Sequence, residues 1–326
     1  MTTPADLQTR QYKHIFGPVL SRRLGRSLGV DIMPFKTCTY DCVYCEQGRT
    51  TNHTACRKEY VSTADVLAEL KEFLASHPAP DYITLSGAGE PTLHARLGDI
   101  VQGVKKLTRV PLAVITNGSL LWEPTVRDAL HDADLVLPSL DAGNARLFEY
   151  VDRPISCISF ERMLGGLLRF RESFHNAIWL EVLLLAGVTS GESEVREIAD
   201  WVRRIRPDRV QLNTVVRPPA ESFALPVPRE QLELLATLFD PRAEIIADYS
   251  GPSQEIKLSP NAARVLELIE RRPCSLQEIA ATLGLRRIET AKLVARLVNQ
   301  NKIGERRFGK DTFFAMVHEG NEEVAE

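Results

Sequence analysis

Three cysteines stand close together near the N-terminal end of the chain, in the run CTYDCVYCEQG. Cys38, Cys42 and Cys45 follow the spacing C-x3-C-x2-C and lie within eight residues. Thiolates are the ligands that iron–sulfur clusters select, and a [4Fe-4S] cluster held by three cysteines leaves one iron free to bind a small molecule. The run therefore predicts a metal centre with one open coordination position.

The same thiolates could belong to a zinc site instead. Zinc usually has four ligands arranged in two spaced pairs. His53 and Cys56 could complete such a site, but no second Cys/His pair stands nearby. Cys56, Cys157 and Cys274 are scattered, so we interpret them as structural or incidental thiols. The iron–sulfur centre is the favoured hypothesis and zinc the alternative.

The composition is that of a soluble globular protein. The chain has 326 residues, 44% of them apolar, and a net charge of −3, which allows one large α/β domain and a smaller one. Its first residues contain no apolar signal segment, and the apolar stretch 177–188 is short and interrupted by Glu181. We therefore expect a cytoplasmic protein with reduced cysteines and no membrane partner.

Charge is unevenly distributed along the chain. Residues 1–257 carry 29 Lys/Arg and 33 Asp/Glu, residues 258–318 carry 11 and 6, and the last eight residues add four glutamates. A basic segment thus follows a mildly acidic one. We predict a barrel domain with a wrapping C-terminal segment at 1–250, a linker at 251–257, a second domain at 258–318 and an acidic tail at 319–326.

Six apolar runs rich in Val, Ile and Leu alternate with amphipathic stretches, the pattern of parallel βα units. The expected strands are 29–33, 82–86, 112–116, 135–139, 179–185 and 209–215. Ser62 or Thr63 is placed to cap the helix after the first strand, and Ser190 to open a later one. We predict an α/β fold, a partial (βα)6 TIM barrel in which the strand C-termini share one mouth.

From residue 259 the pattern changes to three short helices and a hairpin. Ser275 and Glu278 form a capping box for the second helix, and Gly284 ends it. The third helix is expected at 286–300, and the hairpin turns at 309–310. This order predicts a winged-helix domain.

Glycines and polar residues follow the expected strands. They are Gly87, Gly89 and Glu90 after the second strand, Asn117 after the third, and Ser139 with Asp141 after the fourth. Because strand ends share one mouth, we expect these residues to line a ligand site. Each could also be an ordinary turn residue, with Asn117–Gly118 as a turn pair and Asp141 as a helix cap.

Two further strand ends could place polar groups deeper in the barrel, facing a substrate. These groups are Glu181, and Asn213 with Arg217. A charged residue inside an apolar strand costs stability unless it is paired or faces a polar cavity, so we expect a functional or salt-bridged Glu181. Arg217 could instead anchor the proline-rich segment that follows it.

Three segments together resemble the wyosine-synthetase-related branch of the radical SAM superfamily. They are FGPVLSRRLGRSLGVDIMPFKTCTYDCVYCEQG, LSGAGEPTLH and QLNTVVRPPAE, and the resemblance covers roughly residues 16–225. It implies a [4Fe-4S] cluster that chelates S-adenosylmethionine (SAM) and, reduced by a flavodoxin- or ferredoxin-like donor, cleaves it to a 5′-deoxyadenosyl radical that abstracts hydrogen from a substrate. Tyr44 would stack on the adenine. Glu90 and its glycines would bind the amino group, and Asn117, Ser139 and Asp141 the ribose and carboxylate.

The best-known relatives of this branch build a tricyclic base of tRNA from pyruvate, with a second cluster on upstream cysteines and a lysine that holds pyruvate. Here no cysteine precedes Cys38, and Lys13 and Lys36 are candidates for the lysine only by proximity. We therefore expect a different substrate, with a tRNA or other RNA base, a peptide and a small metabolite all open.

Basic residues on the third helix and the hairpin of the second domain could follow a phosphate backbone. The candidates are Arg286, Arg287, Arg296, Arg306, Arg307 and Lys310. The alternative is a protein-docking or lid module whose basic residues keep it soluble. A cluster-sensing DNA-binding regulator would also use cysteines and a winged helix, but it would not need the strand-end residues, so an enzyme is favoured.

Overall fold

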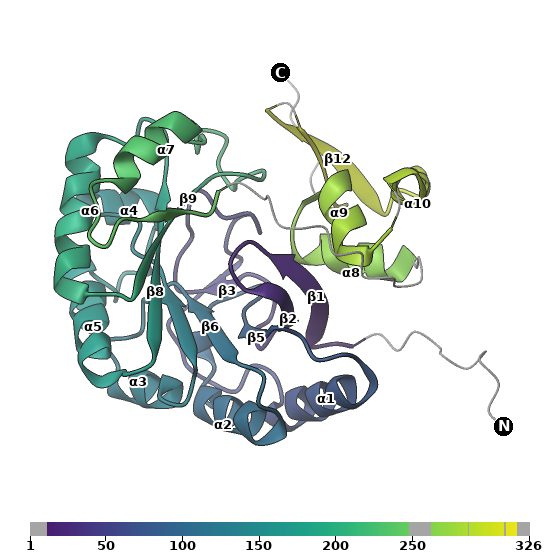
Figure 1. Cartoon of the computed structure of the whole chain (residues 1–326), viewed down its shortest axis with the longest axis horizontal. Coiled ribbons are helices and arrows are strands. Elements are labelled where there is room, and N and C mark those ends of the chain that lie inside the picture. The colour runs from purple at the N-terminus through teal and green to yellow at the C-terminus, as the bar shows by residue number, and fades with distance from the viewer. Residues whose placement is uncertain (1–11, 248–261, 286, 310, 318–326) are drawn as a thin grey trace.

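The larger part of the protein is an open, mostly parallel sheet with helices on its outside (Figure 1). The computed structural model describes residues 12–247, 262–285, 287–309 and 311–317. The strands stand in the order β1-β2-β5-β6-β7-β8-β9-β10. Their bounds are β1 Ile15–Ser21, β2 Gly25–Val30, β5 Tyr82–Leu85, β6 Leu112–Thr116, β7 Leu135–Pro138, β8 Ala177–Leu184, β9 Arg209–Thr214 and β10 Glu244–Ile245.

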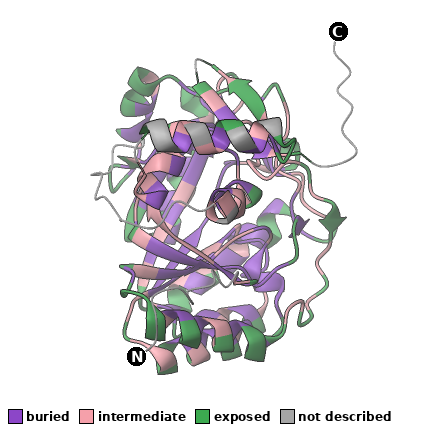
Figure 2. Ribbon diagram, turned by 90° about the vertical axis from the view of Figure 1, so that its right-hand side faces the viewer, coloured by how far each residue is buried: buried purple, intermediate pink, exposed green. Residues whose placement is uncertain are grey.

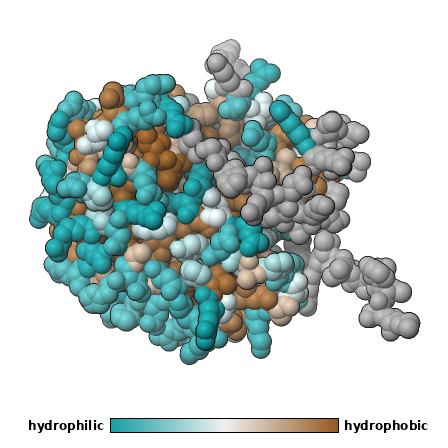
Figure 3. All heavy atoms as spheres, viewed as in Figure 1, coloured by the Kyte–Doolittle hydropathy of each residue, from teal (hydrophilic) through white to brown (hydrophobic). Residues whose placement is uncertain are grey.

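Helices connect the parallel strands and cover their outer face. They are α1 Thr63–Ser76, the short η1 Pro91–Leu93, α2 Leu97–Leu107, α3 Pro124–Leu130, α4 Ala145–Val151, α5 Phe160–Ser173, α6 Glu192–Ile205 and α7 Arg229–Ala236. The strands are largely buried, whereas the helices expose their outer faces (Figure 2). Hydrophilic side chains cover much of the outer surface of these helices (Figure 3). The predicted partial TIM barrel is therefore confirmed.

The six predicted strands are β2, β5, β6, β7, β8 and β9. Strand β2 begins at Gly25 rather than at residue 29. Arg26 and Ser27 interrupt the apolar pattern, but their backbones still pair in the sheet. Strand β1, antiparallel to β2, was not predicted because Gly17 and Pro18 break its apolar pattern. Ser62 caps α1 as expected, whereas the prediction for Ser190 is wrong, since the N-cap of α6 is Gly191.

Alternation along β8 separates the helix side of the sheet from the barrel interior. Leu180, Val182 and Leu184 are fully buried against the helices, and the residues between them face the interior. Glu181 and Leu183 accordingly line the internal cavity. A polar side chain at an interior-facing position of a strand can thus contribute to a ligand site in this cavity.

A C-terminal unit of three helices and a small sheet lies beside β1 (Figure 1). Its elements are α8 Ala262–Arg271, β11 Cys274–Ser275, α9 Leu276–Leu283, α10 Arg287–Asn299, β12 Ile303–Phe308 and β13 Asp311–Met316, and the strands stand in the order β11-β13-β12. The unit has its own apolar core, which includes Val265, Val294 and Leu297. The capping box of Ser275 and Glu278 and the left-handed Gly284 after α9 are confirmed.

Two adjacent glycines of α5 allow a test of how this helix packs on the loop after β6. A Cβ at Gly166 would lie 2.4 Å from the backbone nitrogen of Trp122, whereas a Cβ at Gly165 would meet only the flexible Arg169 side chain at 3.4 Å. Gly165→Ala should raise the free energy of unfolding by up to about 1 kcal/mol, because alanine favours the helix. Gly166→Ala should lower it by about 1–3 kcal/mol, because the methyl group forces α5 off the loop. Urea unfolding measures both, and equal effects of the two substitutions would contradict this packing.

Candidate active site

A cavity of about 440 Å³ lies at the barrel mouth. Its wall contains the three clustered cysteines and all ten of the other residues that the sequence placed at a cofactor or substrate site. These ten are Tyr44, Gly87, Gly89, Glu90, Asn117, Ser139, Asp141, Glu181, Asn213 and Arg217. Side chains from the loops after β2, β5, β6 and β7 thus meet interior positions of β8 and β9 in one place.

The cysteine loop follows β2 and is held by short backbone hydrogen bonds. It includes the small pair β3 Thr37–Cys38 and β4 Asn52–His53. Each of the three sulfurs has a polar neighbour. Lys36 Nζ donates to Cys45 Sγ at 3.1 Å, and Asn117 Nδ2 lies 3.5 Å from Cys38 Sγ. The Cys42 thiol lies 3.6 Å from Asp152 Oδ1. All three cysteines are half-buried and line the cavity.

Burial affects the protonation of two of these thiols, those of Cys38 and Cys42. It raises the pKa of Cys38 to about 12, with the negative charge of Glu90 adding to the effect. Burial also raises the pKa of Cys42 well above its ordinary value, and the Asp152 carboxylate adds to this shift. Metal ligation by Cys38 and Cys42 would therefore displace their protons.

The donor set fits a multi-iron cluster better than a single ion. No three His, Cys, Asp or Glu side chains in the described part of the chain are placed to share one metal ion. His53 Nε2 contacts the carbonyl oxygen of Thr39 at 2.9 Å, and Cys56 is exposed. Zinc needs its ligands around one centre. A [4Fe-4S] cluster instead offers each thiolate a different iron, which suits three separated thiols on one cavity wall.

The glycine-rich turn after β5 supports the cysteine loop. The backbone nitrogen of Lys36 donates to Ala88 O at 2.7 Å, and that of Glu90 donates to Thr37 O at 3.1 Å. A Cβ at Gly89 would lie 2.3 Å from Thr37 O, and Gly87 has a φ of +152°. These glycines are therefore required by contacts within the protein.

The Glu90 carboxylate connects the C-terminal ends of β5 and β6 by hydrogen bonds. It is buried and accepts hydrogen bonds from Thr92 Oγ1 at 2.5 Å, Thr116 Oγ1 at 2.6 Å and the backbone nitrogen of Asn117 at 2.8 Å. Burial raises the pKa of Glu90, and these hydrogen bonds oppose that shift. In the structure this residue thus shapes the turn that leads from β6 to Asn117.

Tyr44 and Asp141 hold each other at the mouth. The Tyr44 hydroxyl donates to Asp141 and lies 3.3 Å from Asp152 Oδ1. Asp141 also accepts from the backbone nitrogen of Leu183 at 2.7 Å. The suggested helix cap at Asp141 is wrong, because Asn144 caps α4. The ring of Tyr44 is therefore fixed against the cavity wall beside Cys42 and Cys45.

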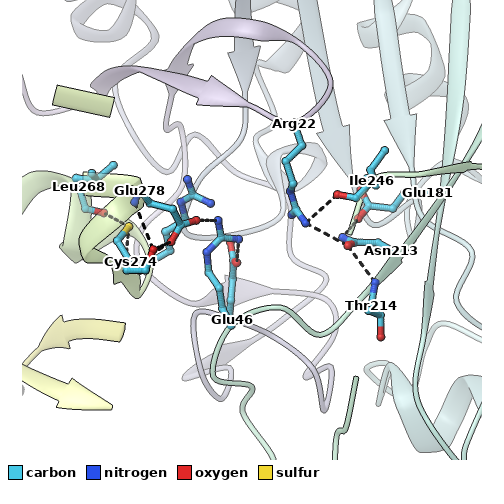
Figure 4. Close-up of polar contacts among 12 residues, drawn as sticks. Arg22, Glu46, Glu181, Asn213, Thr214, Ile246, Leu268, Cys274 and Glu278 are labelled. Atoms are coloured by element: carbon cyan, nitrogen blue, oxygen red, sulfur yellow. Dashed lines mark hydrogen bonds and ion pairs between the residues drawn. The ribbon is translucent and has the colours of Figure 1, made fainter. Parts of the chain in front are cut away.

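Two arginines that the sequence analysis missed enter the barrel from the turn between β1 and β2. Arg23 Nη1 forms an ion pair with Glu181 Oε2 at 2.5 Å, so the expected pairing of Glu181 is found. Arg22 Nη1 donates to Asn213 Oδ1 and to Ile246 O, both at 3.2 Å (Figure 4). Asn213 Nδ2 in turn donates to Glu181 Oε1 at 2.8 Å. The only sequence signal is an Arg–Arg pair between two short apolar runs.

The C-terminal unit closes one side of the cavity. Arg217 Nη1 contacts Glu46 Oε2 at 2.9 Å, and its other terminal nitrogen pairs with Glu278 of α9. Arg271 of α8 pairs with Asp31 at 2.6 Å. Arg217 therefore joins the barrel to the C-terminal unit, rather than anchoring only the proline-rich segment. Arg271 and Arg272 also line this cavity, and no pattern in the sequence indicates that they do.

Comparison with known proteins identifies the family. The Radical SAM superfamily profile matches residues 32–202. A UPF0026 protein of Helicobacter pylori strain J99 is 34% identical over 92% of this chain and 96% of its own length. A protein of Brachyspira hyodysenteriae named GTPase Obg is 38% identical over 93% of this chain, which spans only 45% of that protein.

Solved structures agree on the fold. Streptococcus suis SuiB bound to its precursor peptide SuiA matches 67% of this chain and 48% of its own with a TM-score of 0.52 at 13% identity. In the described residues no helix is long and apolar enough to cross a membrane. The chain therefore belongs to the radical SAM superfamily of enzymes, which use a [4Fe-4S] cluster and SAM, and within it to the family of UPF0026 proteins.

Proposed function

We propose that Cys38, Cys42 and Cys45 hold the [4Fe-4S] cluster and that the chain uses it to cleave SAM and to abstract hydrogen from a second substrate. The observation that carries this proposal is that the three thiols and the strand-end side chains share the wall of one cavity. When bound, the cluster supplies one-electron reduction of SAM and so generates a 5′-deoxyadenosyl radical. Radical SAM enzymes need an electron donor, and we propose a flavodoxin- or ferredoxin-like protein here.

The chain's own residues would stabilise the thiolates and orient SAM. The Lys36 ammonium group beside Cys45 Sγ and the Asn117 amide near Cys38 Sγ would offset negative charge on sulfur. The fixed ring of Tyr44 would provide a flat surface for the adenine. Ser139 and the turn from Gly87 to Glu90 would offer polar groups to the methionine and ribose. The buried wall would exclude water from the reacting atoms.

We further propose that residues 258–318 form a winged-helix domain that contacts RNA, the substrate of the enzyme, and that 1–250 form the barrel domain. The helix–strand order of the C-terminal unit and its separate core support this division. Arg287 on α10 and Arg306 and Arg307 on β12 are exposed, as phosphate contacts require. Arg286 and Lys310 lie outside the described residues, as does the side chain of Arg296.

The cluster assignment predicts different effects for two cysteines. Cys42→Ala should leave no stable cluster and no detectable 5′-deoxyadenosine, because it removes one of the three ligands. Cys56→Ala should change neither, since Cys56 is exposed and outside the cavity wall. Iron and sulfide analysis with anaerobic product detection under dithionite measures both. Cleavage of SAM by the Cys42 variant would contradict the assignment.

The RNA hypothesis predicts a change in the salt dependence of binding. Replacing both Arg287 and Arg307 with alanine should weaken tRNA binding. It should also make the plot of log affinity against log salt less steep, by about 1.5 in slope, because each lost phosphate contact removes roughly 0.7–0.9. Binding is measured by fluorescence anisotropy with labelled tRNA. Arg196→Ala on the exposed face of α6 is the control. An unchanged slope in the double variant would exclude these arginines as phosphate contacts.

A further inference from the structure

The cavity contains more guanidinium groups than carboxylates to pair with them. Three arginines in its wall have an ion-pair partner: Arg23 with Glu181, Arg217 with Glu46 and Glu278, and Arg271 with Asp31. Two others, Arg22 and Arg272, line the same cavity but form no ion pair with any described residue. The charges of these two side chains are therefore not taken up by an ion pair within the described part of the chain.

Arg22 is deeply placed and only partly satisfied. Its Nη1 donates to Asn213 Oδ1 and Ile246 O, while Nε and Nη2 make no hydrogen bond with any described residue. Figure 4 shows its guanidinium group pointing from the β1–β2 turn into the space between Glu46 and Asn213. Its free donors lie on the cavity wall, where a ligand could supply acceptors for them.

Arg272 acts on the same region from the C-terminal unit. It directly follows α8, and its guanidinium group has no hydrogen-bond partner among the described residues. Arg22 lines the same cavity from the β1–β2 turn of the barrel. The two guanidinium groups thus reach one cavity from opposite parts of the protein.

Guanidinium groups outnumber carboxylates around these two arginines. Burial lowers the pKa of Arg22 to about 10, and repulsion by Arg217 adds to this shift. Four guanidinium groups, those of Arg22, Arg23, Arg217 and Arg272, stand against the three carboxylates of Glu46, Glu181 and Glu278. An incoming anion would balance this excess.

We propose that Arg22 and Arg272 bind an oxyanion, a phosphate or carboxylate group, of the second substrate. This inference rests on the proposed function, because it specifies the substrate that the same cavity takes. Guanidinium groups present paired donors that match phosphate and carboxylate oxygens. Because Arg22 belongs to the barrel and Arg272 to the C-terminal unit, a bound oxyanion would contact both parts of the protein.

The test uses the reconstituted full-length protein and inorganic phosphate as the probe. Isothermal titration should show phosphate binding that Arg22→Gln and Arg272→Gln each weaken by about tenfold or more, because each removes a charge-assisted contact. Arg272→Lys keeps the positive charge but loses the planar guanidinium group with its paired donors, so this variant should bind phosphate with intermediate affinity. Arg196→Gln, on the exposed face of α6, is the control and should bind phosphate as the unaltered protein does. Arg272 forms no hydrogen bond or ion pair with a described residue, so its replacement should leave the melting temperature nearly unchanged.

A separate titration with SAM distinguishes the two sources of an oxyanion. The affinity for SAM should change by less than about threefold in both variants, since the proposal assigns these donors to the other substrate. An equal loss of SAM and phosphate affinity would mean that the arginines bind the carboxylate of SAM, and would overturn the proposal. So would phosphate binding that both variants retain in full, or no phosphate binding by the unaltered protein.

The outcome is separable from that of the proposed function. If the unaltered protein forms 5′-deoxyadenosine but binds no phosphate, the oxyanion site is wrong while SAM cleavage stands. If phosphate binds at these arginines and no 5′-deoxyadenosine forms under reduction, the oxyanion site stands and the proposed function fails.

Discussion

The ion pair between Arg23 and Glu181 solves the main problem of an open barrel, which is how to close a polar interior without a last pair of strands. Edge strands β1 and β10 do not pair with each other. Glu181 and Asn213 instead receive donors from Arg23 and Arg22, which reach across the interior from the β1–β2 turn. Removing one partner of such a buried pair leaves an uncompensated charge, which typically costs about 3–5 kcal/mol. The ion pair and the hydrogen bonds of Asn213 thus let two interior strand positions of the barrel carry polar side chains.

A second set of contacts connects the C-terminal unit to the support of the cysteine loop. Asp31 pairs with Arg271 of α8 and also accepts a hydrogen bond from the backbone nitrogen of Ala88 at 3.2 Å, in the glycine-rich turn. Within the same glycine-rich turn, Ala88 O accepts a hydrogen bond from the backbone nitrogen of Lys36. Displacement of α8 would thus disturb the turn beside the cysteines. The C-terminal unit is therefore part of the cavity wall.

Local patterns in the sequence were sufficient to predict the six parallel strands from β2 to β9, but not the edge strands β1 and β10. Strand β6 has the predicted bounds, because its apolar run is short and flanked by turn residues. The partners of buried charges could not be predicted in this way. Arg23 and Glu181 are 158 residues apart, and Arg271 and Asp31 are 240 apart. Nor could periodicity show that Glu90 would be surrounded by Thr92, Thr116 and Asn117, since that depends on how two strand ends meet.

We propose that the three thiolates at the barrel mouth hold a cluster with an open iron at which SAM binds. Electron paramagnetic resonance of the reduced, reconstituted protein tests it most directly, using SAM labelled with ¹⁵N at the amino nitrogen. The account predicts that SAM changes the cluster spectrum and that the labelled nitrogen shows a hyperfine coupling. A spectrum identical with and without SAM, and no coupling, would contradict it.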